Sequence, residues 1–156
     1  MKIYSLRRTQ KLPITRAQAW DFFSSPTNLK ILTPEHLDFR ITSQVDGMKM
    51  YPGQIISYTI RPLLHIPIEW VTEITHVQDY TYFIDEQRFG PYKFWHHEHR
   101  FQALPNGVQM TDTIYYTLPF GILGKALNAL HVRGQIEEIF SYRKTKMHTL
   151  FGQYTG

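Results

Sequence analysis

The chain has 156 residues, of which 42% are hydrophobic, 15% aromatic and 19% charged, and its formal net charge is +4. This length and composition predict one globular domain over residues 1–156 with a sizeable core. Because the sequence contains no cysteine, disulfides, thiolate metal sites and cysteine nucleophiles are excluded.

Charge and targeting signals limit where the chain can act. The segment MKIYSLRRTQKL at the N-terminus lacks the apolar region of a signal peptide, and no run approaches 18 apolar residues. We therefore expect a cytoplasmic protein without stable membrane insertion. The positive charge would suit nucleic acid or anionic lipid, but a surplus this small is typical of an ordinary surface. The aromatic residues are not interleaved with basic ones as on a nucleic-acid platform, so we expect no nucleic-acid partner.

The first third of the chain predicts one strand and two short helices. Residues 2–11 have the composition of a strand, and Pro13 ends it. Thr15 is a suitable N-cap for a helix over residues 16–23, RAQAWDFF, whose apolar residues recur at helical spacing. A second short helical turn is expected at residues 28–31.

Five or six strands follow, and several of them alternate apolar with polar residues. Short turns at residues 90–91 (Gly-Pro) and 105–107 (Pro-Asn-Gly) imply antiparallel neighbours. The expected strands lie within residues 36–44, 53–63, 66–77, 80–89, 92–104 and 108–118.

The chain closes on a segment that predicts a single long amphipathic helix, residues 121–151. It contains no proline, and its apolar residues follow helical spacing. An antiparallel sheet needs a cover for its apolar face, and this helix is the obvious one. We therefore expect an α+β fold in which a curved antiparallel sheet grips the C-terminal helix, with a candidate cavity between them.

The segment FWHHEHRF, residues 94–101, predicts a strand whose two faces differ. Alternation places Trp95, His97, His99 and Phe101 on one face, which we assign to the concave, helix-facing side. His96 then belongs to the outer surface, so the three histidines do not form one contiguous cluster.

The next strand offers a partner for the inward histidines. If the hairpin loop is residues 104–107, the register pairs His99 with Asp112, whereas a two-residue loop would shift it by two and pair Phe101 with Asp112. In both registers Asp112 lies close to His99 on the same face. A buried carboxylate needs a partner, and a histidine supplies one.

Four interpretations of His97, His99 and Asp112 stay open. They can form a satisfied polar pair in a core, a polar contact for a ligand, a metal site, or an acid/base pair. We see no fourth metal ligand at convincing spacing, and we expect neither a metal nor a cofactor. No serine stands in a nucleophile elbow, and there is no glycine-rich phosphate loop.

The basic run YRKTK, residues 142–146, lies late in the expected helix. Its simplest role is a solvated face that complements the helix dipole. A membrane-surface or protein-binding module that uses this end of the helix is the third class of function considered.

The element order, with FIDEQRFGPYKFWHHEHRF, TDTIYYTLPFGILG and IEEIFSYR, resembles the START-related helix-grip superfamily, SRPBCC. The chain is most similar to its bacterial polyketide cyclase/dehydrase-like ligand-binding members. The most specific part is the G-P-x3-W-x-H-x-H-x-F pattern at residues 90–101. The resemblance implies a deep pocket between sheet and helix for a hydrophobic or amphipathic small molecule. It does not decide between binding and catalysis, since the superfamily contains both.

We therefore expect a ligand-binding protein whose oligomeric state stays open. The alternative is a cyclase, dehydratase or hydrolase on the same scaffold that uses His99 with Asp112 as its acid/base pair. The residues expected to contact the ligand are Trp70, Gln87, Trp95, His97, His99, Phe101, Asp112 and Tyr116.

Overall fold

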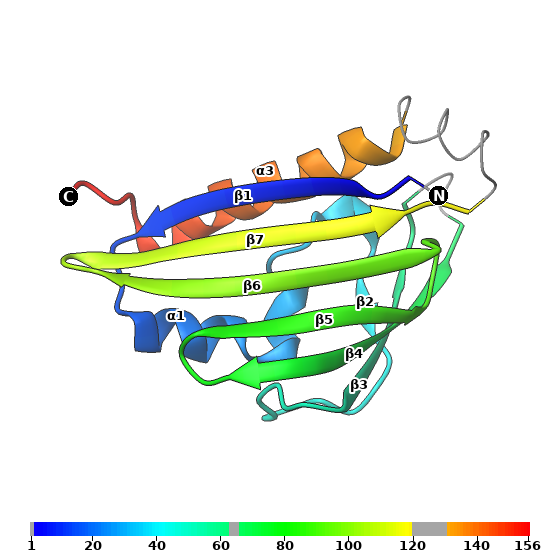
Figure 1. Ribbon diagram of the computed structural model, residues 1–156, viewed down its shortest axis with the longest axis horizontal. Helices are drawn as coiled ribbons and strands as arrows, with labels where there is room; N and C mark the ends of the chain where they lie inside the picture. Colours follow the sequence, from blue (N-terminus) through cyan, green and yellow to red (C-terminus); the bar gives the residue numbers. More distant parts are fainter. Residues whose placement is uncertain (1, 63–65, 120–130) are drawn as a thin grey trace.

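The structure is a computed structural model that describes residues 2–62, 66–119 and 131–156. In these residues seven strands form one antiparallel sheet in the order β1-β7-β6-β5-β4-β3-β2 (Figure 1). The strands are β1 (Tyr4–Leu12), β2 (Arg40–Ile41), β3 (Gln54–Ile60), β4 (Ile68–Gln78), β5 (Tyr82–Phe89), β6 (Phe94–Leu104) and β7 (Gly107–Thr117). The helical elements are α1 (Arg16–Phe23), α3 (Arg133–Phe151) and two 3-10 turns, η1 (Pro26–Lys30) and η2 (Glu35–Leu37).

The start of α1 follows the prediction. Pro13 comes directly after the last residue of β1, and Thr15 is the N-cap of α1. The Thr15 hydroxyl accepts a hydrogen bond from the Gln18 backbone N–H at 3.1 Å, and the Gln18 side chain accepts one from the Thr15 backbone N–H at 2.9 Å. This reciprocal capping box fixes the helix so that Trp20 and Phe23 are buried in the core.

The segment between α1 and β3 agrees with the prediction at its start and differs from it further on. The turn η1 covers most of the short helical turn expected at residues 28–31. The strand expected at residues 36–44 was wrong in its extent, because η2 occupies its start and β2 keeps two residues at its centre. Asp38 interrupts the extended backbone with a left-handed φ of 43°, and its carboxylate binds Arg40 at 2.9 Å and Arg61 at 3.1 Å.

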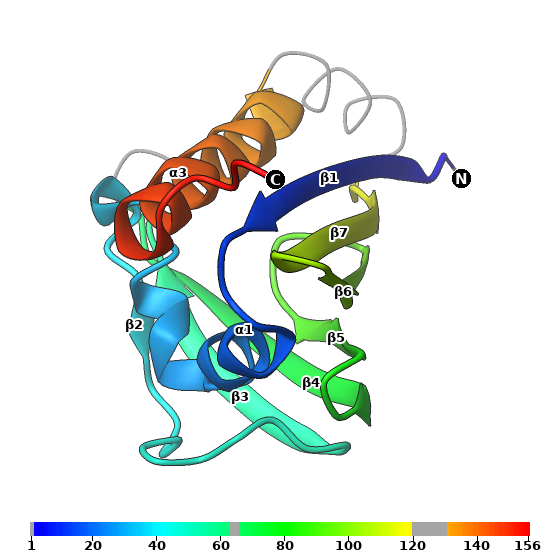
Figure 2. The same ribbon diagram turned by 90° about the vertical axis from the view of Figure 1, so that its left-hand side faces the viewer.

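The sheet is strongly curved, and β4 contributes to this curvature. Its pairing with β5 shifts between Val71 and Thr72 and again between Ile74 and His76. Such bulges bend a strand and increase its local twist. Figure 2 shows the sheet curving around α1, with α3 lying across the open side.

The β6–β7 hairpin adopts the register that brings the expected residues together. Ala103 pairs with Val108 and His99 pairs with Asp112. The unpaired residues of the loop are Pro105 and Asn106, so the expectation that a two-residue loop would shift the register was wrong.

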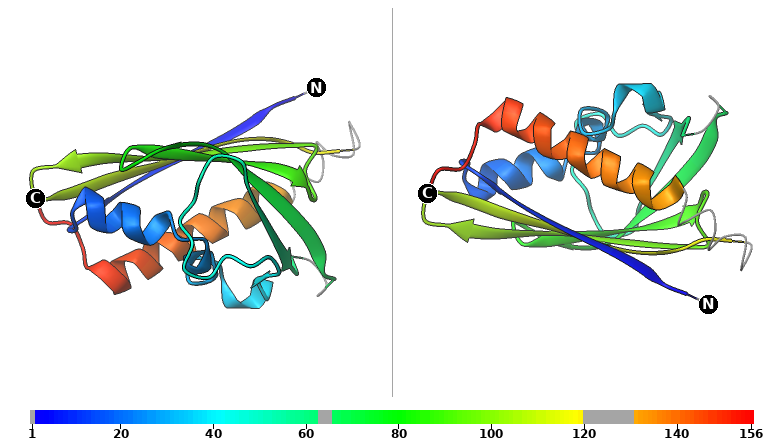
Figure 3. Two further views of the ribbon diagram at one scale, coloured as in Figure 1. Left: turned by 90° about the horizontal axis from the view of Figure 1, so that it is seen from below. Right: turned by 90° about the horizontal axis from the view of Figure 1, so that it is seen from above.

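The helix α3 crosses the concave side of the sheet (Figure 3) and buries Ile136, Phe140 and Met147. The part of the predicted helix that falls on residues 121–130 lies outside the described residues. Leu150 is one of the apolar residues at helical spacing in the predicted helix, but it is 46% exposed. The expected α+β helix-grip fold is confirmed, and no described helix has the length and apolar character of a membrane span.

Candidate functional site

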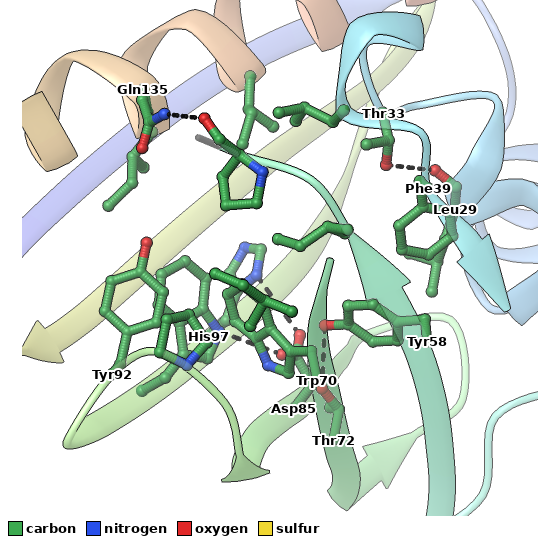
Figure 4. Close-up of a pocket in the computed structure, with 18 of the residues that line it drawn as sticks. Leu29, Thr33, Phe39, Tyr58, Trp70, Thr72, Asp85, Tyr92, His97 and Gln135 are labelled. Atoms are coloured by element: carbon green, nitrogen blue, oxygen red, sulfur yellow. Dashed lines mark hydrogen bonds and ion pairs between the residues drawn. The ribbon is translucent and has the colours of Figure 1, made fainter. Parts of the chain in front are cut away.

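A cavity of about 380 Å³ lies between the concave face of the sheet and α3. Its wall comes from the segment after α1, from β3 to β6 and from α3 (Figure 4). This volume falls within the range of about 300–1,000 Å³ that is usual for small-molecule sites. Most lining side chains are apolar, among them Phe39, Ile56, Ile60, Ile68, Phe83 and Ile139.

Aromatic rings form one continuous part of the cavity wall. The ring centroids of Trp70 and Trp95 lie 5.3 Å apart at 85°, and Tyr92 lies 4.8 Å from Trp95. Tyr58 stacks on Trp70 at 5.7 Å. The Trp70 indole N–H is buried and has no hydrogen-bond partner among the described groups. The cavity wall is therefore apolar here, and the indole N–H has almost no area exposed to the cavity.

The turn between β5 and β6 positions this aromatic wall. The Gln87 side chain donates to the Tyr92 carbonyl at 2.6 Å and accepts from the Tyr92 backbone N–H at 3.2 Å. Gly90 has a φ of 152°, and a Cβ at this position would overlap the Gln87 side chain. Gln87, expected to contact a ligand, thus shapes the turn and is not among the described cavity-lining residues.

Three neighbouring strands bring two histidines and two aspartates together on the concave face. We call Asp85, His97, His99 and Asp112 the His–Asp cluster. His99 lies between the carboxylates, with Nε2 at 2.8 Å from Asp85 Oδ2 and Nδ1 at 2.9 Å from Asp112 Oδ1. His97 also lies between the two carboxylates, with Nε2 at 2.9 Å from Asp112 Oδ1 and Nδ1 at 3.4 Å from Asp85 Oδ2.

Burial and mutual contact set the charges of this cluster. Burial favours neutral histidine, but the hydrogen bonds to Asp112 and Asp85 outweigh it and raise the pKa of His99. Burial and the nearby His99 lower the pKa of His97. Burial would raise the pKa of both carboxyl groups, but the two histidines outweigh it and lower both values. These directions favour the ionised form of both carboxyl groups, and they favour a proton on His99 over one on His97.

The helix α3 adds a cationic group to the cavity. Arg143 lines it, with the guanidinium 5.1 Å from the Phe140 ring centroid and Nε donating to the Leu32 carbonyl at 3.3 Å. The run at residues 142–146, expected to be a solvated face, therefore has one member turned inward. Tyr58 and Thr72 add hydroxyl groups that lie 3.1 Å from each other in the cavity wall near Asp85 (Figure 4).

The structure brings some of the expected site residues to the cavity and leaves others beside it. Trp70, Trp95, His97 and His99 line the cavity. Phe101 packs in the core beside α1, Tyr116 packs in a second cluster beside Ile136, and Asp112 lies behind the two histidines.

Asp85 and Arg143 are two of the polar lining residues that the sequence interpretation missed. Asp85 had a usable signal, because Phe83, Asp85 and Gln87 alternate along one strand and Gln87 was already assigned to the cavity side. Arg143 had a weaker signal, since the rotation of a helix about its axis is set by packing.

The His–Asp cluster has the donor atoms for two kinds of chemistry. Paired imidazoles and carboxylates can transfer protons to and from a bound molecule. One ligand atom each from Asp85, His97 and His99 also lie within 4.8 Å of one another, which is compatible with a metal ion.

No sequence-family model and no curated protein matches the chain. Solved structures do match it over nearly its whole length. Protein CV1439 from Chromobacterium violaceum is 12% identical with a TM-score of 0.72, covering 96% of this chain and 99% of that one. Protein Ms6760 from Mycobacterium smegmatis is 16% identical with a TM-score of 0.67, covering 96% of each chain.

A norcoclaurine synthase point mutant from Thalictrum, in complex with a transition state analogue, has the same fold. It is 13% identical with a TM-score of 0.66, covering 96% of each chain. These likenesses agree with the expected helix-grip fold. At such low identities the fold is what they establish, and function must be argued from the site.

Proposed function

We propose that the chain binds a hydrophobic or amphipathic small molecule in the cavity between the sheet and α3. The observation that carries the proposal is a wide apolar lining with polar groups gathered at a few places on the wall. Burial of the ligand's apolar surface supplies most of the affinity, at about 25 cal/mol per Å² before the costs of ordering.

The polar groups of the wall favour a ligand with an oxygen at one end. Asp85 and Arg143 both line the cavity. The Asp85 carboxylate can accept a hydrogen bond from a hydroxyl group, and the Arg143 guanidinium can donate one to it.

Native mass spectrometry of the purified chain, followed by the same spectrum after denaturation, tests this proposal. We expect a small molecule that copurifies with the folded chain and is released on unfolding. A chain that carries no such molecule and also fails to bind the neutral apolar dye Nile red would contradict it.

Acid/base catalysis is a second candidate function, favoured by one observation. His97 contacts two carboxyl groups, and it lines the cavity together with His99 and Asp85. The similar norcoclaurine synthase shows that this fold can support an enzyme. The predicted pair, His99 with Asp112, is present, but each histidine contacts both aspartates.

The variant His97→Gln separates the two functions once a bound molecule has been identified. A binding protein keeps its fold and loses about tenfold in affinity, the equivalent of one hydrogen bond. An enzyme loses turnover by several orders of magnitude while its affinity changes little.

A further inference from the structure

The His–Asp cluster directs three electron-pair donors toward one point. In the tautomers that carry hydrogen on His97 Nε2 and His99 Nδ1, both rings donate to the same atom, Asp112 Oδ1, at 2.9 Å each. The other two nitrogens then present lone pairs to Asp85 Oδ2, at 3.4 and 2.8 Å. Three such atoms repel one another unless a proton or a cation lies among them.

We propose that Asp85, His97 and His99 bind a divalent transition-metal cation such as Zn²⁺, with Asp112 holding both imidazoles in the ligating tautomer. Two imidazoles and one carboxylate form a common ligand set for such ions. The inference goes beyond the proposed function, because binding of the ion requires no organic ligand.

Two of the three ligand separations are close to those that an ion on the Asp85 side of the rings requires, and all three are within 4.8 Å. Bonds of about 2.0–2.2 Å place two ligands of a tetrahedral Zn²⁺ about 3.3 Å apart. The separation of His97 Nδ1 from Asp85 Oδ2 is already 3.4 Å. The separation of His99 Nε2 from Asp85 Oδ2 is 2.8 Å and must widen by about 0.5 Å.

The Asp112 side of the rings is less suitable for the ion. It borders a space of only about 10 Å³, which leaves no room for further ligands and is also lined by the cationic Arg143. Asp85, His97 and His99 instead line the large cavity, where water or a ligand oxygen can complete the coordination shell. Asp112 then does not bind the ion but accepts hydrogen bonds from the two histidines and so orients them.

Two carboxylates supply the charge that a dication needs. Arg143 also lines the cavity and interacts with Asp85, but its guanidinium is engaged with the Leu32 carbonyl and the Phe140 ring. Asp85 further accepts a long hydrogen bond from the Trp95 indole at 3.4 Å, through Oδ1 rather than Oδ2. The ligating oxygen therefore stays directed at the histidines.

Isothermal titration of the full chain with Zn²⁺, after removal of metals by a chelator, tests the proposal. We expect saturable binding of one ion per chain. Titration with Co²⁺ should give visible absorption bands typical of nitrogen and oxygen ligands. Absence of saturable binding, or a Co²⁺ spectrum equal to that of the aqueous ion, overturns the proposal without any variant.

Variants then assign the ligands. His97→Gln, His99→Gln and Asp85→Asn should each weaken Zn²⁺ binding by more than about 100-fold, and Asp112→Asn by about 10–100-fold. The matched control is His96→Gln, because His96 forms a similar pair with Glu86 at 2.8 Å on the outer face of the same strand. The control should bind as the unmodified chain does.

Circular dichroism and thermal unfolding of the metal-free variants show whether each one folds. Unchanged binding by a folded His97→Gln variant, or loss of binding in His96→Gln, would overturn the proposed site. A greater loss in Asp112→Asn than in Asp85→Asn would overturn the assignment of Asp85 as the ligand.

Discussion

At the scale of single residues, the cavity wall contains a buried network in which every member depends on the others. The side chain of His99 is 8% exposed and those of Asp85 and Asp112 are 16% and 12% exposed. Removing one partner of such a network leaves an uncompensated buried charge, which costs far more than the pair contributes. The cluster therefore fixes the geometry of the wall, whatever else it binds.

Substituting Asp112→Asn should destabilise the metal-free chain by roughly 3–5 kcal/mol at pH 7, since His99 would lose one of its two carboxylate partners. The two histidines hold the pKa of Asp112 below its ordinary value of 3.8. A carboxyl group with a lowered pKa in the folded state contributes stability above its unfolded pKa and loses it as the pH falls below that value. The difference in unfolding free energy between the unmodified chain and the variant should therefore shrink between pH 5 and pH 3, below the range in which His99 titrates.

Urea denaturation at both pH values measures this difference. Asp46→Asn is the control, because Asp46 is exposed and should change stability little. A difference that stays constant or grows on acidification would contradict the assigned role of Asp112.

At the scale of elements, the β5–β6 turn positions the aromatic residues of the cavity wall. Gln87 binds both backbone polar groups of Tyr92, and Tyr92 packs against Trp70, Trp95 and Tyr116. The turn is thus linked by direct contacts to residues of β4, β6 and β7. A small change in the backbone of the turn should therefore alter both the shape of the binding site and the stability of the fold.

Substituting Gly90→Ala should destabilise the chain more than Gly53→Ala does. Both glycines have a positive φ, 152° and 87°, which costs a side-chain-bearing residue about 1–3 kcal/mol. A Cβ at Gly53 meets no atom within 4 Å, whereas one at Gly90 displaces Gln87 and adds the loss of its hydrogen bonds to Tyr92. Thermal unfolding of the two variants checks this, and equal shifts would show that the Gln87 contact contributes nothing.

The sequence predicts elements well where local chemistry decides them. Alternation along β6 placed His97 and His99 on the concave face, and the short β6–β7 loop limited the register enough to bring Asp112 beside them. Asp85 was missed because its position opposite His97 depends on the register between β5 and β6, and alternation along each strand does not determine that register. Tyr116 and Phe101 share the correct face, but their places along the strands put them in packed core instead.

At the scale of the whole molecule, the cavity depends on how far the sheet and α3 stay apart. Apolar periodicity looks the same whether two faces pack tightly or enclose a space. The sequence therefore could not show whether the space between the sheet and α3 is open or filled. The structure shows a cavity of about 380 Å³ there. The polar positions are closely spaced along the strands, while the apolar area is distributed over the segment after α1, the sheet and the helix.

Filling the cavity should abolish binding of an apolar probe and leave the fold intact. Ile68 lines the cavity and is partly exposed, so Ile68→Trp should project a larger ring into the space and weaken Nile red binding at least tenfold. Ile55 lies on β3 with 48% exposure and is not among the described lining residues, so Ile55→Trp is the control. Dye fluorescence measures both, and equal binding by the two variants would place the dye elsewhere.

The pairing of β1 with β7 has a consequence for how the chain reaches its structure. Tyr4 pairs with Tyr116 and Leu12 with Val108, so the two strands meet across most of the chain. Closing such a long loop costs conformational entropy before any contact offsets it, and folds rich in distant pairings form slowly. During synthesis on the ribosome β1 emerges first but has no strand to join until β7 follows. β1 is therefore among the last strands to pair within the sheet, although it is the first of them in the sequence.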